Sequence, residues 1–162
     1  MRSIETIHKG AQKIIEKAIR DESRAQGHYL TGKMEQSLTA STQKEGNADV
    51  MEGTAISYTK FVNEGFPAAS ASFKQMPFLI EYFKLRGLPE KEAVGAAAAT
   101  IRVWQRDGMP TAASSRFSKN QKRIEMIQDA MKAADTVLDA YMNKAFDAAV
   151  NEQFLKEKSE TI

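Results

Sequence analysis

Three features of this 162-residue chain have residue types that chemistry could use: two histidines, a carboxylate beside an apolar stretch, and a lone tryptophan. His8 and His28 fall in a predicted helix and in the loop after it, and a metal site would need carboxylates converging on them from elsewhere. Glu64 follows an apolar-aromatic stretch and could act as an acid, but no second carboxylate stands at a spacing that would place it alongside. We therefore interpret the histidines as surface or packing residues and Glu64 as a hydrogen-bonding residue at a turn.

The motifs of common enzymes are absent from the sequence. It contains no Walker phosphate loop, no G-x-G-x-x-G, no G-x-S-x-G and no H-E-x-x-H. The lack of cysteine excludes disulfides, thiolate metal sites and cysteine nucleophiles. We predict that the protein is not an enzyme and uses no cofactor and no metal, with an enzyme of an unrecognised kind as a minor alternative.

Basic residues gather in one segment, although the net charge of the whole chain is only +2. Between Ile101 and Arg123 there are six basic residues and one acid, Asp107, which gives +5; the remaining 17 basic and 20 acidic residues give −3. The six are Arg102, Arg106, Arg116, Lys119, Lys122 and Arg123. Such a segment is typical of a contact surface for DNA or an acidic neighbouring subunit, and equally of a solvated polar loop. Trp104 could stack on a base, but a lone tryptophan in a helical pattern is more simply a core residue.

The first part of the chain predicts a helix followed by a hairpin. Apolar residues recur at three- and four-residue steps from Ile4 to Ile19, which places them on one face of a helix over 3–24. Weakly alternating segments at 37–42 and 50–56 flank a polar turn at 44–49 and predict two antiparallel strands. A two-stranded sheet is marginal alone, so these strands must pack on a helix, on further strands or on another subunit.

The second part predicts three more helices. Pro77 suits a first helical position, and Phe78, Leu79, Tyr82 and Phe83 would form an apolar face of a helix that ends at Gly87. Residues 91–105 predict a helix whose small residues favour close packing on another helix. Residues 107–121 lack a helical period and read as a long loop with room for a third strand.

The last helix is the longest, with a heptad-like spacing of apolar residues from Ile124 to Ala149. A helix of roughly 30 residues is longer than one small domain can cover, so part of its apolar stripe is expected to pack on a neighbouring chain.

The predicted fold class is therefore α+β, with an N-terminal helix, a small antiparallel sheet packed on helices, and a long C-terminal helix. We interpret residues 1–162 as a single domain. Its parts are a helix at 1–26, the hairpin with a Tyr/Glu/Gly motif at 31–65, helices at 77–106, a basic loop at 107–121 and the long helix at 122–158. The N-terminal residues form no apolar run of signal-peptide length, and no stretch of about 20 apolar residues predicts a membrane span.

Two short motifs carry a resemblance to a known family. The first is TGKMEQSL at 31–38 and the second is ISYTKFVNEG at 56–65, on either side of the predicted hairpin. In this order they resemble the tail-completion proteins, also called head–tail joining or neck proteins, of long-tailed bacteriophages. The segment IRVWQRDGMP at 101–110 is similar to a helical insertion in larger members. The matching motif residues are Thr31, Gly32, Met34, Ser37, Tyr58, Phe61, Val62, Glu64 and Gly65.

The resemblance implies a role for these residues and for the protein. Gly32 and Gly65 would permit tight turns. Tyr58, Phe61 and Val62 would clamp a helix against the sheet, and Glu64 would cap or pin the loop. The resemblance further implies a structural virion protein, assembled in the host cytoplasm, whose copies form a ring between the portal-adaptor complex and the tail. In that ring the basic segment would face the next subunit or, without sequence specificity, the packaged DNA. No membrane partner is expected.

Two alternatives from other classes remain open. A nucleic-acid-binding module would use the six basic residues between Arg102 and Arg123, and its binding should weaken steeply with salt. A helical adaptor or regulator of an enzyme would instead use the long helix.

Overall fold

The computed structural model describes residues 4–46 and 48–160, so residues 1–3 of the predicted first helix and Asn47 of the predicted turn lie outside the described residues. The chain divides into two compact units, each built from segments far apart in the sequence. Unit 1 contains Met1–Ser23, Lys33–Ile56 and Ile127–Ile162, and unit 2 contains Arg24–Gly32 and Ser57–Met126. That the two units together form one domain remains a prediction from the sequence.

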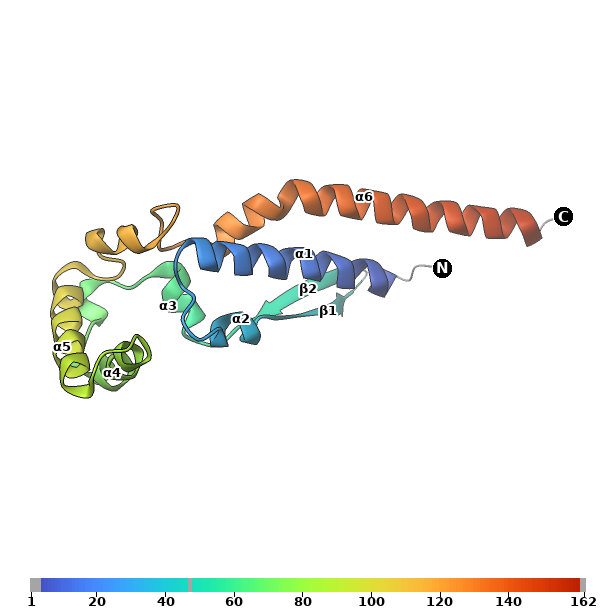
Figure 1. Cartoon of the computed structure of the whole chain (residues 1–162). Coiled ribbons are helices and arrows are strands. Elements are labelled where there is room, and N and C mark those ends of the chain that lie inside the picture. The colour runs from blue at the N-terminus through green and yellow to red at the C-terminus, as the bar shows by residue number, and fades with distance from the viewer. Residues whose placement is uncertain (1–3, 47, 161–162) are drawn as a thin grey trace. The chain divides into compact units, whose positions relative to one another are not determined.

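Unit 1 combines helices with a hairpin, and the α+β fold class predicted from sequence is confirmed (Figure 1). Helix α1 spans Ile4–Ala25 and short helix α2 spans Lys33–Ser37. Strands β1 and β2 span Thr39–Glu45 and Ala48–Thr54, and helix α6 spans Met126–Glu160. In α1, Ile7 and Ala11 are buried as their four-residue spacing predicts.

The hairpin pairs β1 with β2 in an antiparallel register that runs from Thr39 opposite Thr54 to Glu45 opposite Ala48. Its outer face is polar: the two threonine hydroxyls lie 2.6 Å apart and Gln43 Nε2 donates to Glu52 Oε2 at 3.0 Å. Among the described residues the sheet has only these two strands. The third strand expected within 107–121 is reduced to a single antiparallel bridge between Phe66 and Met109 in unit 2.

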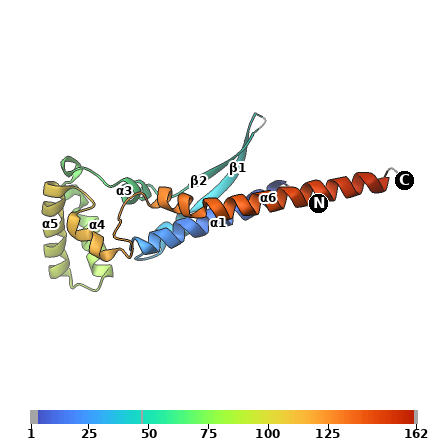
Figure 2. The same cartoon turned by 90° about the horizontal axis from the view of Figure 1, so that it is seen from above.

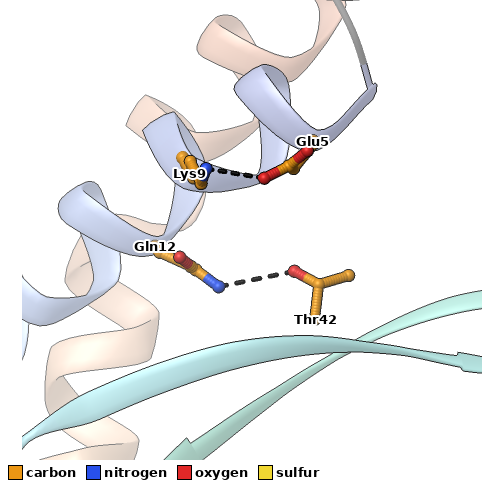
Figure 3. Close-up of polar contacts among 4 residues, drawn as sticks. All are labelled: Glu5, Lys9, Gln12 and Thr42. Atoms are coloured by element: carbon orange, nitrogen blue, oxygen red, sulfur yellow. Dashed lines mark hydrogen bonds and ion pairs between the residues drawn. The ribbon is translucent and has the colours of Figure 1, made fainter.

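Side-chain contacts hold the hairpin to the rest of unit 1. Gln12 Nε2 of α1 donates to Thr42 Oγ1 of β1 at 3.4 Å, as Figure 3 shows beside the ion pair between Glu5 and Lys9. At the base of the hairpin, Ile56 N donates to Ser37 Oγ at 3.1 Å. Figure 2 shows the strands diverging from α1 toward their hairpin turn.

Helix α6 lies antiparallel beside α1 and continues past the N-terminal end of α1 (Figures 1 and 2). Tyr141 Oη donates to the carbonyl oxygen of Ile7 at 3.1 Å. Gly10 lies directly beneath that ring, because a Cβ on Gly10 would overlap the Tyr141 hydroxyl and ring. The long C-terminal helix predicted at 122–158 is confirmed, but it begins at Met126 because Glu125 has a left-handed φ of 59°.

Unit 2 is built around a helical hairpin. Helix α4 spans Met76–Leu85 and helix α5 spans Glu90–Asp107, which confirms the helices predicted at 77–106. Short helix α3 spans Thr59–Glu64, and three 3-10 segments span Ala68–Ser70, Phe73–Gln75 and Ala112–Phe117. The last of these lies in the segment read from sequence as a loop.

The core of unit 2 explains the small residues of α5. Leu79 of α4 packs with Ala97 and Ile101 of α5, and Trp104 lies against this cluster. Ala97 and Ile101 are fully buried, so the alanines let α4 approach closely, as the sequence predicts. Phe78, in contrast, points to solvent rather than into the apolar face to which we assigned it, because it lies about 100° around the helix from Leu79.

Candidate assembly surfaces

The six basic residues predicted as a contact surface all belong to unit 2 but lie in different surroundings. Arg102, on α5, is exposed. Arg106 forms a two-point ion pair with Asp107, with Nε and Nη2 each 2.6 Å from a carboxylate oxygen. This contact raises the pKa of Arg106 and lowers that of Asp107, and it offsets the charge that Arg106 presents to a partner.

Three of the basic residues, Arg116, Lys119 and Lys122, follow α5. The Arg116 guanidinium lies 4.8 Å from the centre of the Phe117 ring, and both side chains are exposed. The backbone N–H of Lys119 donates to the Ala25 carbonyl at 2.7 Å while its side chain remains exposed. Lys122 Nζ lies 4.0 Å from Glu125. Arg116 and Lys119 therefore join Arg102 as basic side chains exposed on this unit.

Arg123 is held inside unit 2. Its Nη1 donates to the carbonyl oxygens of Gln26 and Gly27 at 2.7 and 3.3 Å, and burial lowers its pKa. Gln26 is fully buried and donates back to the Ile124 carbonyl at 3.0 Å. His28 Nε2 lies 3.1 Å from Gln26 Oε1, and burial, followed by the charge of Arg123, lowers the His28 pKa to about 4. This cluster fastens the end of the basic segment to the turn at 26–28.

The residues of the tyrosine motif form an aromatic chain that reaches α5. Phe61 is 53% exposed, and its ring centre lies 6.4 Å from that of Phe66 in an edge-to-face arrangement. Phe66 meets Trp104 in the same manner at 5.2 Å. These ring contacts lead to α5 rather than to the sheet, so they are not the expected clamp of a helix against the sheet, and Tyr58 is exposed. Trp104 packs in the core, which confirms the simpler interpretation of this residue.

The remaining motif residues lie at turns. Gly32, with φ 73°, directly precedes α2, and Thr31 before it is exposed. Gly65, with φ 71°, follows α3, and a Cβ there would overlap the Met109 carbonyl oxygen. These angles confirm the turns expected at both glycines. Glu64 Oε2 lies 4.0 Å from Lys60 Nζ on the exposed side of α3. This contact is to a side chain, whereas we expected a hydrogen bond to the backbone of the turn.

A surface that the sequence only partly indicated lies on α6. Phe146, Val150 and Phe154, which we call the α6 stripe, are 41%, 66% and 64% exposed. They follow one another at four-residue steps, so they share one side of the helix. Val150 comes nine residues after Tyr141, which rotates it about half a turn away from the side that meets α1. The α6 stripe is therefore an apolar face separate from the α1 contact.

A second apolar surface lies on α4. An open hollow of about 570 Å³ lies along one side of α4, lined by Pro77, Ile80, Glu81, Lys84 and Leu85, and we call this surface the α4 groove. Leu85 at its end is exposed, and the neighbouring Phe78 is 75% exposed. Lys84 also pairs with Glu90 at 3.2 Å on the rim. The sequence missed this groove because the apolar residues of α4 surround most of the helix, and their period does not reveal which side α5 covers.

The two units carry opposite net charges. Unit 1 has 11 basic and 15 acidic residues, which gives −4, and unit 2 has 12 basic and six acidic residues, which gives +6. The α6 stripe therefore belongs to an acidic unit and the α4 groove to a basic one.

The described residues contain neither a candidate metal-binding cluster nor a candidate membrane-spanning helix. His8 is buried on α1, and within 4–46 and 48–160 no group of three or more histidine, aspartate and glutamate side chains could hold a metal ion. Over the same ranges no helix combines the length and apolar character that crossing a bilayer requires.

Comparison with protein-family models, with curated proteins and with solved structures finds no match for this chain.

Proposed function

We propose that this protein is a structural virion protein, a neck or tail-completion subunit whose copies form a ring that joins the portal-adaptor region of a bacteriophage to its tail. It is assembled in the host cytoplasm and acts by geometry, without catalysis. The sequence support for this proposal is the pair of motifs around the hairpin, from Thr31 to Leu38 and from Ile56 to Gly65.

The structural observation that carries the proposal is the exposed α6 stripe. A helix of 35 residues rises about 52 Å, whereas the 22 residues of α1 cover about 33 Å, so α1 cannot shelter its whole length. Three large apolar side chains in line on the uncovered side are typical of an interaction site. Burying them contributes roughly 25 cal/mol for each Å² of apolar surface removed from water. A subunit of a larger assembly gains this energy from its neighbours.

The hairpin supports the same proposal. Its two strands have no further strand partner among the described residues, so their outer edges can pair with another chain. Strand addition by a neighbouring subunit would supply main-chain hydrogen bonds, and a closed ring would leave no edge unpaired.

The test is the location of the protein in virions. We expect antibody or gold labelling to place it between head and tail in electron micrographs. We also expect a phage lacking the gene to accumulate filled heads and free tails. Labelling of the capsid shell, or normal joining without the gene, would refute the proposal.

The exposed cations of unit 2 favour nucleic-acid contact as a second candidate function. Arg102, Arg116 and Lys119 are exposed, and Phe117 beside Arg116 offers an aromatic face on which a base could stack. Binding to short duplexes and single strands, measured by fluorescence anisotropy, should weaken steeply between 50 and 200 mM salt. Replacing the three cations by alanine should reduce the salt slope, with Arg123→Ala avoided because Arg123 holds the fold. Absence of binding at low salt would eliminate this candidate.

A further inference from the structure

Unit 1 exposes the α6 stripe, unit 2 exposes the α4 groove, and the two units carry net charges of opposite sign. From this we propose that copies associate through a heterologous contact, in which the α6 stripe of one copy binds in the α4 groove of the next. This inference deepens the proposed function. It rests on that function in one respect, that successive contacts close into a ring.

Both surfaces are faces of single helices that carry apolar side chains at helical spacing. The α6 stripe presents three large side chains at four-residue steps, which is how an amphipathic helix anchors itself in a groove. The α4 groove has about 570 Å³ of space and three apolar residues among its five lining residues. Phe154 is 64% exposed, and Glu157 and Lys158 follow it on the next turn of α6. We place Phe154 in the hollow because these two charges could then reach Glu81 and Lys84.

The charges near each surface are complementary. Glu157 and Lys158 follow Phe154 on the stripe side of α6, and the α4 groove carries Glu81 and Lys84. With Phe154 in the hollow, Lys158 would meet Glu81, and Glu157 would meet Lys84. Over longer distances, the −4 of unit 1 and the +6 of unit 2 favour encounter between unlike units.

The same charges disfavour a symmetric pairing. Between Asp139 and Lys158, three acidic residues (Asp139, Asp147 and Glu157) and one basic residue (Lys158) project within about a quarter turn of Val150 on α6, which leaves a net charge of −2. Two α6 stripes placed face to face would therefore bring two acidic surfaces together. Two α4 grooves would likewise bring two basic units together. The contact between unlike faces is the arrangement without this repulsion.

A heterologous contact repeats, because a row of copies keeps a free stripe at one end and a free groove at the other until a ring closes. Three anchor side chains make a surface well below the roughly 800 Å² per partner of a stable interface. A single contact is therefore weak and concentration-dependent, and the ring gains stability from closure.

Disulfide crosslinking tests the geometry directly, because the chain has no cysteine of its own. Lys158→Cys and Glu81→Cys proteins are prepared separately, mixed and oxidised. We expect a mixed disulfide dimer. The matched control is Lys156→Cys, whose side chain projects about 200° around α6 from Lys158 and should give little product with Glu81→Cys. A mixed product no greater than that control, or a dominant Lys158→Cys self-crosslink, would overturn the proposal.

A second experiment separates a heterologous contact from a symmetric one. Val150→Asp disables the stripe and keeps the groove, whereas Leu85→Asp disables the groove and keeps the stripe. Each variant alone should sediment as a monomer, and an equimolar mixture should form a dimer that grows no further. Circular dichroism checks that both variants are folded. A mixture that stays monomeric although wild type associates would refute the contact, while the location of the protein in virions would remain a separate result.

Discussion

Two helix pairs in this chain, α4 with α5 and α1 with α6, are held together in different ways. The α4–α5 pair of unit 2 encloses an apolar cluster in which Leu79 fits against Ala97 and Ile101. The α1–α6 pair of unit 1 has a polar fastening, in which Tyr141 crosses Gly10 to reach the Ile7 carbonyl. Both units bury apolar residues, among them Ile7, Ala11 and Ala145 in unit 1. The two pairs therefore differ in the polar contact that fixes α6 on α1, and in the exposed apolar stripe on the far side of α6, rather than in whether a core is present.

The largest effect is expected from the core of the α4–α5 pair. Ile101→Ala should lower the free energy of unfolding by about 2–5 kcal/mol, because Ile101 is fully buried and its truncation leaves a cavity. Urea denaturation followed by circular dichroism measures the change. Val94→Ala on the exposed side of the same helix is the control and should change the free energy by no more than about 0.5 kcal/mol. Equal losses in the two variants would contradict the assigned core.

A smaller effect with a change of sign is expected at the α1–α6 crossing. Gly10→Ala should destabilise the protein by about 1–3 kcal/mol, because the added methyl group overlaps the Tyr141 ring. In a Tyr141→Ala background the same substitution should stabilise it by about 0.5–1 kcal/mol, since alanine is the better helix former. Urea unfolding of the four proteins measures this coupling. Equal effects in both backgrounds would show that Tyr141 does not cover Gly10.

A pH effect on stability is expected in unit 2, at His28. His28 has its pKa lowered from 6.5 to about 4 by burial, so the unfolded chain binds the proton more readily than the folded one. Stability should therefore be fully present above pH 6.5 and fall as the pH decreases toward 4, by about 1–2 kcal/mol after allowance for solvent screening. His28→Gln should flatten the difference in urea midpoint between pH 7 and pH 4.5. An unchanged pH profile would remove His28 from the cluster around Arg123.

The smallest effect is expected at the exposed ion pair on α1. Lys9 lowers the pKa of Glu5, but both side chains are solvent-exposed. Glu5→Gln should leave the urea midpoint within experimental error, because an exposed pair gains little over its separate hydration. A clear loss would show that the N-terminal part of α1 contributes more to unit 1 than the Tyr141 crossing implies.

The elements with a clear period were predictable from the sequence. The apolar steps in α1, the small residues of α5 and the long stripe of α6 each indicated a helix that is present. The polar turn between alternating segments indicated the hairpin. Regular patterns report local structure because burial selects the same face at every turn. The start of α6 was misplaced, since the left-handed φ of Glu125 has no signature in residue type.

The surroundings of single residues were less predictable. Arg123 was grouped with surface cations, yet it donates to backbone carbonyls of Gln26 and Gly27, far away in the sequence. A backbone acceptor has no residue type, so no pattern could reveal it. Phe78 was assigned to the apolar face that it does not share, because α4 is apolar on most sides. Residues Gln26, Gly27 and His28 form a polar turn before the first motif, which indicated a structured site there. The sequence did not indicate that Arg123 is the residue that binds this turn.

The hydroxyl of Tyr141 on the Ile7 carbonyl has a consequence for length. Since Gly10 is the point of closest approach, α6 cannot slide along α1 by one turn without placing a larger side chain under the ring. The axial register of the two helices is thereby locked. The distance by which the end of α6 reaches beyond α1 is then a constant of the subunit, and in a stacked assembly it would act as a spacer of fixed size between successive layers.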